Sequence, residues 1–231
     1  MSELPNQGSS RDRLLAAALS LIAQQGYAQT STAQVARKAG TSESQLIKHF
    51  SSKEGLLEAL FEATWNDLNR RVGQLTSSDD PVERLRAIVA LMLSRFAAND
   101  EVRRLLLFEG RRIRSRGAAV SDGFIRFVEG IDALVADAKR AGRLRAPVAP
   151  RAIRSVLIGA CEGMLRDRQL AEEASYPAAY SRKDIQRAME VLISAFFIDS
   201  PSPRSRRRGT QPEHLGARRR HDREGAAQKI T

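Results

Sequence analysis

The sequence predicts an all-α protein. Residues that favour helices, chiefly alanine, leucine, arginine and glutamate, dominate the chain. Apolar residues recur at helical spacing in segments separated by polar, glycine or proline residues, and long alternating runs of β-branched residues are absent. Hydrophobic residues make up 42% of the 231 residues, which is enough for a core in one large or two small domains.

The N-terminal part predicts a short disordered segment and then a helix-turn-helix domain. Residues 1–10 are polar and lack a hydrophobic signal core. Residues 11–57 begin with an apolar helix that ends near Gly26. A second helix is expected over residues 32–39, with Ser31 as its N-cap and the glutamine three positions later as the reciprocal partner.

A glycine turn leads into the third helix. Gly40 can adopt the left-handed backbone conformation that ends a helix. The next helix is expected over residues 42–49, with Leu46 and Phe50 on one side and polar side chains on the other. Two short helices joined in this way form a helix-turn-helix, whose second helix, the reading helix, can enter the major groove of DNA.

A long helix and a polar break follow. Residues 53–75 carry apolar side chains at helical spacing and predict one long helix, with Ser51 and Glu54 as its capping box. Residues 76–80 form the break. Asp80 and the proline after it then mark the start of the next helix.

The remaining segments also predict helices, which would form a C-terminal helical bundle over residues 58–199. Apolar residues repeat along one face of the last two helices, and this face either packs inside the chain or meets a second copy. A loop is expected over residues 117–123. Helices are expected over residues 101–114, 124–141, 151–171 and 181–198.

Residues 200–231 predict a disordered basic tail. The segment has few large aliphatic residues, so it buries too little apolar surface to offset its ordering entropy. It holds nine Lys and Arg against three Asp and Glu, which is more than half of the formal net charge of +11. Its arginine clusters, residues 204–208 and 218–220, either add a non-specific DNA contact or are simply solvated.

The sequence offers little support for catalysis, a metal or a cofactor. The histidines are His49, His214 and His221, and neither they nor Cys161 show metal-ligand spacing. No Gly-rich phosphate loop occurs, and Ser/His/Asp partners cannot be assembled. No apolar run approaches the roughly 18–20 residues needed to span a bilayer. A single cysteine fits a reducing compartment, so we expect a cytoplasmic protein without catalytic residues, cofactor or metal.

Residues 16–60 resemble the DNA-binding region of TetR-type transcriptional regulators. The resemblance starts with the apolar first helix and the Gly26-Tyr27 stop. It continues through Thr30, Ser31, Val35, Ala36, Ala39, Gly40, Ser42, Leu46, His49, Phe50, Lys53, Glu54, Leu56 and Leu57. The family usually has tyrosine where this chain has Ile47, so a hydroxyl that often touches phosphate or base is absent here.

The resemblance implies double-stranded DNA as a partner. Gln45 either pairs with an adenine edge through its amide or completes a capping box with Ser42. Lys48 can reach a guanine edge or a phosphate, and His49 is either a phosphate contact or a packed imidazole. The hydroxyl groups at the start of the second helix either donate to phosphate or only cap. The expected DNA-binding residues are Ser31, Thr32, Ser42, Ser44, Gln45, Lys48, His49 and Lys53.

The resemblance also implies that the C-terminal domain binds a small molecule and forms a homodimer through the last two helices. A dimer would place two reading helices on a palindromic operator. A small, mainly apolar effector would bind among the central helices. Its candidate lining residues are Trp65, Leu68, Met92, Phe96, Phe108, Phe124 and Phe127. The candidate dimer contacts are Ile153, Val156, Leu157, Ala160, Met164, Ile185, Met189, Leu192 and Phe196.

The predicted function is that of a sequence-specific DNA-binding transcriptional regulator, a repressor released by its effector. The resemblance implies that the effector moves the helix over residues 53–75 and thereby changes the separation of the two reading helices. Two alternatives stay open. One is a non-specific nucleic-acid-binding protein that uses its basic tail, and the other is a helical small-molecule enzyme.

Overall fold

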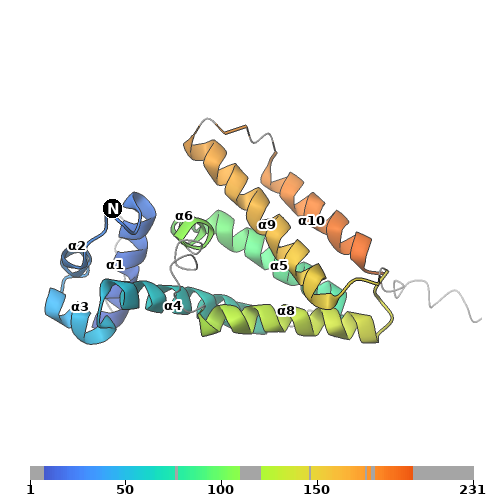
Figure 1. The fold of residues 1–231 in the computed structure, drawn as a ribbon, viewed down its shortest axis with the longest axis horizontal. Coiled ribbons are helices and arrows are strands. Elements are labelled where there is room, and N and C mark those ends of the chain that lie inside the picture. The colour runs from blue at the N-terminus through green and yellow to red at the C-terminus, as the bar shows by residue number, and fades with distance from the viewer. Residues whose placement is uncertain are drawn as a thin grey trace, which may run out of the picture. The chain divides into compact units, whose positions relative to one another are not determined.

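In the computed structural model, the regular elements of the described residues are all helices, joined by loops (Figure 1). The β-structure in this part of the chain is one isolated bridge between Leu144 and Phe197. The all-α prediction is therefore confirmed. The structure describes residues 8–75, 78–109, 121–145, 147–174, 176–177 and 180–199, with only the backbone of residue 109. The expectations for residues 1–7, for most of the loop at 117–123 and for the tail at 200–231 lie outside these residues.

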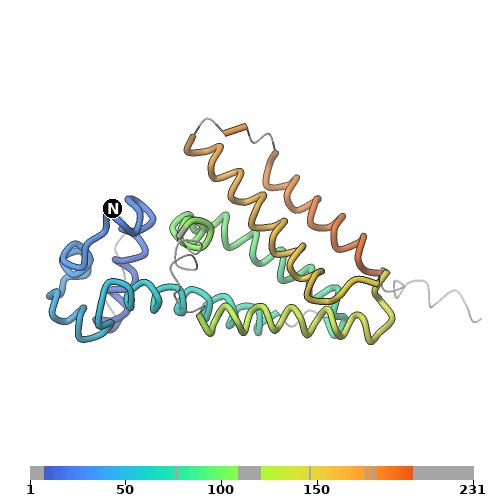
Figure 2. Tube along the Cα trace, viewed as in Figure 1, coloured from blue at the N-terminus to red at the C-terminus, as the bar shows by residue number. Residues whose placement is uncertain are grey.

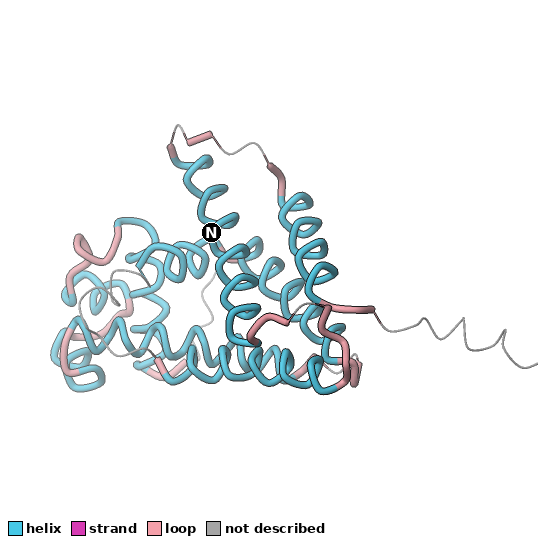
Figure 3. The backbone as a smooth tube through the Cα atoms, turned by 45° about the vertical axis from the view of Figure 1, so that its right-hand side comes forward, coloured by secondary structure: helices cyan, strands magenta, loops and turns pink. Residues whose placement is uncertain are grey.

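Short connections join the first helices of the chain to one another (Figures 1, 2 and 3). A serine, aspartate or asparagine side chain caps every one of the α-helices named here except α9, which begins at a proline. In chain order they are α1 (Ser10–Gln25), α2 (Thr32–Lys38), α3 (Glu43–Phe50), α4 (Lys53–Gly73), α5 (Pro81–Ala98), α6 (Asp100–Arg104), the π-helical turn η1 (Leu105–Glu109), α8 (Asp122–Arg140), α9 (Pro150–Glu173) and α10 (Arg182–Phe196).

The first three helices pack with the start of α4 around a small core. Ser31 and Gln34 form the reciprocal capping box predicted for α2, and Gly40 takes a φ of +63° in the turn before α3. The buried residues of this core include Leu14, Leu15, Ala18, Ile22, Val35, Leu46, Phe50, Leu56, Leu57 and Leu60. The helix-turn-helix is thus built as the sequence predicts.

The start of α4 differs from the prediction. Ser51 does not cap this helix, because its φ of 66° places it in a left-handed turn that ends α3. The N-cap is Ser52, and Glu54 accepts a hydrogen bond from the Tyr27 hydroxyl at 3.1 Å. The predicted capping box was wrong, because the sequence does not reveal which of two adjacent serines belongs to the turn after α3 and which one caps α4.

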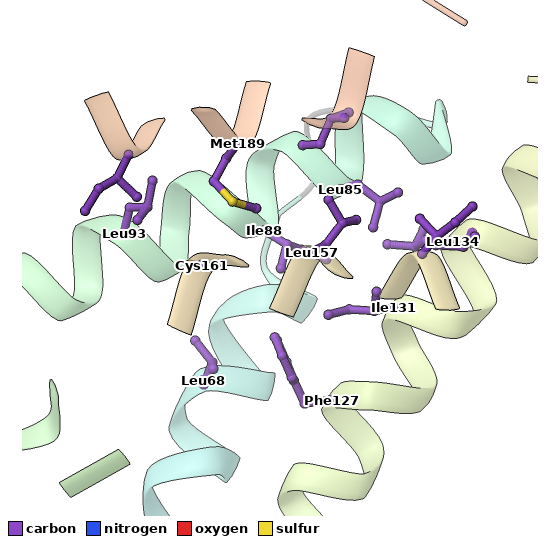
Figure 4. Close-up of a cluster of buried hydrophobic side chains, with 14 of the residues drawn as sticks. Leu68, Leu85, Ile88, Leu93, Phe127, Ile131, Leu134, Leu157, Cys161 and Met189 are labelled. Carbon is purple, nitrogen blue, oxygen red and sulfur yellow. The ribbon is translucent and has the colours of Figure 1, made fainter. Parts of the chain in front are cut away.

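The remaining helices enclose a larger core (Figure 4). α8 packs against α4, α5 and α9, and α9 lies beside α10 with the opposite chain direction (Figure 2). The core residues labelled in the close-up are Leu68, Leu85, Ile88, Leu93, Phe127, Ile131, Leu134, Leu157, Cys161 and Met189. The helix expected over residues 101–114 is α6 followed by η1 within its described part.

Two elements contribute to both cores. α4 places Leu60 in the smaller core and Leu68 in the larger one, and the half-buried Trp65 packs against both. In η1, Leu105 belongs to the smaller core and Leu107 to the larger. A displacement of α4 or η1 would therefore disturb both cores. The domain boundary predicted after residue 57 falls inside α4 and stays a prediction.

Candidate nucleic-acid interface

Buried residues and an N-cap fix the orientation of α3 about its own axis. Leu46 and Phe50 are buried in the smaller core, and the Ser42 Oγ accepts a hydrogen bond from the Gln45 backbone N–H at 3.3 Å. The opposite face is exposed. It carries Ser44, Gln45, Ile47, Lys48 and His49. This face is polar except at Ile47, so it can meet the donors and acceptors of a major groove.

The structure separates the two roles considered for Gln45. In α1 and α2 the third residue returns a side-chain bond to the cap, as Asp12 and Gln34 do. The Gln45 side chain makes no such return bond to Ser42 and has no hydrogen-bond partner among the described residues. Its amide, which both donates and accepts, is therefore available to a base edge.

His49 lies at the end of α3 beside the start of α1. Its Nε2 is 2.8 Å from the Ser10 Oγ, and its ring contacts that of Phe50 with centroids 6.0 Å apart. The side chain is exposed. The Arg11 guanidinium lies over the Phe50 ring at 5.5 Å and adds an exposed cation here that the sequence argument missed. Periodicity alone could not find Arg11, because only tertiary packing brings α1 to this end of α3.

Lys53 occupies the first turn of α4, next to the loop between α1 and α2. Its Nζ lies over the Tyr27 ring at 4.3 Å and donates to the Ala28 carbonyl at 3.4 Å. The Tyr27 hydroxyl donates to Glu54, so the ring that supports Lys53 is itself fixed. A lysine held in this way presents a positive charge at a helix N-terminus, where phosphate is favoured.

The two predicted hydroxyl donors at the start of α2 are already engaged. The Ser31 hydroxyl bonds to Gln34 as part of the capping box. The Thr32 hydroxyl donates to the Glu43 carboxylate of α3. The Thr32 bond joins α2 to α3, the Ser31 bonds lie within α2, and both hydroxyl protons are satisfied. They favour the structural role of Ser31 and Thr32 over the phosphate role.

A cavity of about 130 Å³ lies among α4, α5, α8, α9 and η1. Its wall is mainly apolar, with Glu162 as the acidic member. Five predicted lining residues meet there: Trp65, Met92, Phe96, Phe124 and Phe127. Leu68 instead lines a neighbouring cavity of about 230 Å³ that reaches α1, and Phe108 lines neither of these two.

Hydrogen bonds tie α4 to the start of α8 next to this cavity. The Glu62 carboxylate accepts from the Gly123 N–H and from Arg126, both at 2.8 Å. Burial opposes ionisation of Glu62, but these bonds outweigh it and lower its pKa. A Cβ at Gly123 would lie 2.8 Å from the Cβ of Trp65, so the helices touch at a point where only glycine fits.

The cysteine beside the cavity is not equipped for catalysis. Burial raises the pKa of the Cys161 thiol to about 12, so the reactive thiolate is scarce at neutral pH.

No group of His, Cys, Asp and Glu able to hold a metal ion occurs among the described residues. In that same part of the chain, none of the helices is both long and apolar enough to cross a membrane.

The predicted dimer contacts fall into three sets by burial. Ile153, Leu157, Ile185 and Met189 are buried in the larger core of the single chain. They are covered by other residues of the same chain. Val156 is exposed. The half-buried remainder comprises Ala160, Met164, Leu192 and Phe196.

Comparison with known proteins identifies the family. The family model described as "Bacterial regulatory proteins, tetR family" matches residues 14–60. Nucleoid occlusion factor SlmA of Vibrio campbellii is 30% identical over 161 residues, which cover 66% of this chain and 79% of that protein. The chain belongs to the TetR family. It is a DNA-binding regulatory protein, and its helix-turn-helix is α2 and α3.

Solved structures share the fold of this TetR-family protein at low sequence identity. FadR of Bacillus subtilis, in complex with stearoyl-CoA, matches with a TM-score of 0.70 and 17% identity, covering 80% of this chain and 98% of that one. SmeT, the repressor of the multidrug efflux pump SmeDEF of Stenotrophomonas maltophilia, matches with a TM-score of 0.67 and 19% identity, covering 84% and 92%. The α1–α10 arrangement is thus a known fold.

Proposed function

We propose that this TetR-family regulator is a cytoplasmic homodimeric repressor that binds a palindromic operator and leaves it when a mainly apolar small molecule binds. The observation that carries the proposal is the outward face of α3, where the free amide of Gln45 stands beside Lys48 on a helix fixed by Leu46 and Phe50. Such a face reads bases and contacts phosphates at once. In this proposal, residues 11–57 bind DNA and residues 58–199 sense the effector and dimerise.

The deciding experiment is a selection of random duplex DNA by the purified full-length protein, followed by sequencing of the winning pool. A palindromic motif is expected, because two-fold symmetric reading heads select two-fold symmetric sites. An enriched but non-palindromic motif would contradict the dimer. A pool without enrichment would instead support charge-driven, sequence-independent binding.

The exposed parts of α9 and α10 support a dimer. Val156 of α9, Val191 of α10 and Ile198, which follows α10, are exposed large apolar side chains. Gly159, three residues after Val156, and Ala195, four residues after Val191, are also exposed. Small residues allow helices to approach closely, and the larger ones supply apolar area. We assign this outer face, which includes the predicted contact Val156, to the second copy, and the buried members of the predicted set to the core.

The cavity next to α4 supports an apolar effector. FadR and SmeT share the fold; FadR was solved in complex with stearoyl-CoA, and SmeT is the repressor of a multidrug efflux pump. Trp65 lines the cavity and is the only tryptophan of the sequence, so ligand entry should change the intrinsic fluorescence. Long-chain acyl-CoA and apolar drugs are the first compounds to test by this fluorescence change. A compound counts as the effector only if it also releases the protein from the selected operator.

Nucleoid occlusion is a second candidate function, favoured by the similarity to SlmA. Deletion of the gene distinguishes transcriptional repression from nucleoid occlusion. Altered transcripts next to the bound sites support the repressor. Unchanged transcripts together with division across the nucleoid support nucleoid occlusion.

Lys53→Ala is expected to weaken binding to all duplexes alike. Each lost phosphate contact should make the slope of log affinity against log salt concentration shallower by about 0.9. Fluorescence anisotropy over a salt series measures this slope. Lys139→Ala removes an equal charge from the exposed end of α8 and should leave the slope unchanged. An unaltered slope in Lys53→Ala would remove Lys53 from the interface.

Gln45→Ala is expected to relax the preference at one base pair in each half-site. The loss there should be about 1–3 kcal/mol, because a bidentate amide contact to adenine disappears. Repeating the selection with the variant measures it. Gln24→Ala, on the exposed side of α1, is the matched control. A variant that kept the full preference would show that Gln45 does not read a base.

A further inference from the structure

Ile47 is an aliphatic side chain in the middle of the polar outward face of α3. Its side chain is 43% exposed, and it is the one large hydrophobic residue exposed to this degree within residues 8–75. It is absent from the residues that pack against either core. Single exposed apolar residues are common on protein surfaces, so the position of Ile47 has to decide whether it matters.

The position of Ile47 follows from the rotation of α3. Leu46 is fully buried, and the next residue on an α-helix is turned by about 100°. Ile47 therefore faces outward, next to Ser44, which lies three residues before it on the exposed surface. Lys48 is also exposed and is turned a further 100° around the helix. A helix that enters the major groove with Gln45 and Lys48 brings Ile47 with it.

Base edges in the major groove present hydrogen-bonding groups and one apolar group, the 5-methyl of thymine. An isoleucine cannot bond to the polar groups, and burying it against them would leave them unsatisfied. We propose that Ile47 contacts the 5-methyl group of one thymine in each operator half-site and makes that position specific for T·A. This inference rests on the proposed function, because it requires α3 to read DNA.

The test removes the methyl group and nothing else. Each thymine of the selected operator is replaced in turn by deoxyuridine, symmetrically in both half-sites, which preserves base pairing and every hydrogen-bonding group. At one position the wild-type protein should bind about fourfold more weakly per half-site, hence about 15-fold per symmetric operator. Burial of one methyl group, about 0.8 kcal/mol, corresponds to that change.

Three variants assign the effect to Ile47. Ile47→Ala should bind the thymine and deoxyuridine operators with equal affinity. Ile47→Val, which keeps a branched side chain, should retain part of the difference. Gln45→Ala should bind both operators more weakly and keep the wild-type ratio. Since Ile47 is exposed, thermal unfolding of Ile47→Ala should match that of the wild type.

The outcomes are distinct. Loss of the thymine preference only in the Ile47 variants supports the inference. A selected operator on which deoxyuridine has no effect at any position, or an Ile47→Ala protein that keeps the wild-type ratio, overturns it and leaves the proposed function standing. A selection that yields no motif overturns both.

Discussion

Val191→Arg is expected to convert the dimer into a monomer that binds the operator about 10²–10⁴-fold more weakly. The affinity falls because two linked reading heads bind far more tightly than either head alone. Val191 is 63% exposed on α10, so arginine is accommodated in the single chain but places a charge in the proposed apolar interface. Light scattering measures the mass, and fluorescence anisotropy measures the affinity.

The control for Val191→Arg is Ile125→Arg, which places the same charge on an exposed apolar site of α8. This variant should remain dimeric and keep its affinity. Circular dichroism should show equal helix content in both proteins. A Val191→Arg protein that stays dimeric with full affinity would mean that the copies pair through another surface.

Met189→Ala is expected to lower the free energy of unfolding by about 2–5 kcal/mol, the range for truncating a fully buried large side chain. Met189 has no exposed surface and lies in the larger core with Leu157 (Figure 4). Ile185 belongs to the same core. Urea unfolding of the monomeric Val191→Arg protein, with and without the second substitution, measures the loss within one chain.

The monomeric background makes this second test specific. If Met189 contacted a partner, as the periodicity of α10 allows, its truncation would cost little in a monomer. A loss of the full size there shows that the contacts lie within the chain. The two substitutions therefore separate the inner face of α10 from its outer face, although Met189 and Val191 are only two residues apart.

Local signals predicted the DNA-binding half of the molecule well. The cap at Ser31, the left-handed Gly40 and the apolar pair Leu46 and Phe50 each act within a few residues, and the structure has all of them. The failure at Ser51 and Ser52 has the same origin. Both serines suit a cap, and the choice depends on the turn needed to pack α3 against α4.

The residues that line the cavity illustrate a different limit. Trp65, Met92 and Phe124 are apolar residues at core-like spacing, and nothing local distinguishes a cavity wall from a filled core. Leu68 and Phe108, which share that pattern, lie outside the cavity. A cavity is a property of several helices at once, so it depends on their crossing points, such as the contact between Trp65 and Gly123.

The sequence by itself determined the all-α class, the helix-turn-helix and the polar face of α3, because capping, turn chemistry and helical periodicity act between residues close in the chain. Only the tertiary structure decided which side of α9 and α10 is core, where the cavity lies, and that Arg11 of α1 lies against Phe50 at the end of α3. Apolar residues at helical spacing indicate that one face of a helix is buried, but they do not indicate which neighbouring helix covers that face. That choice is made by packing between helices distant in sequence.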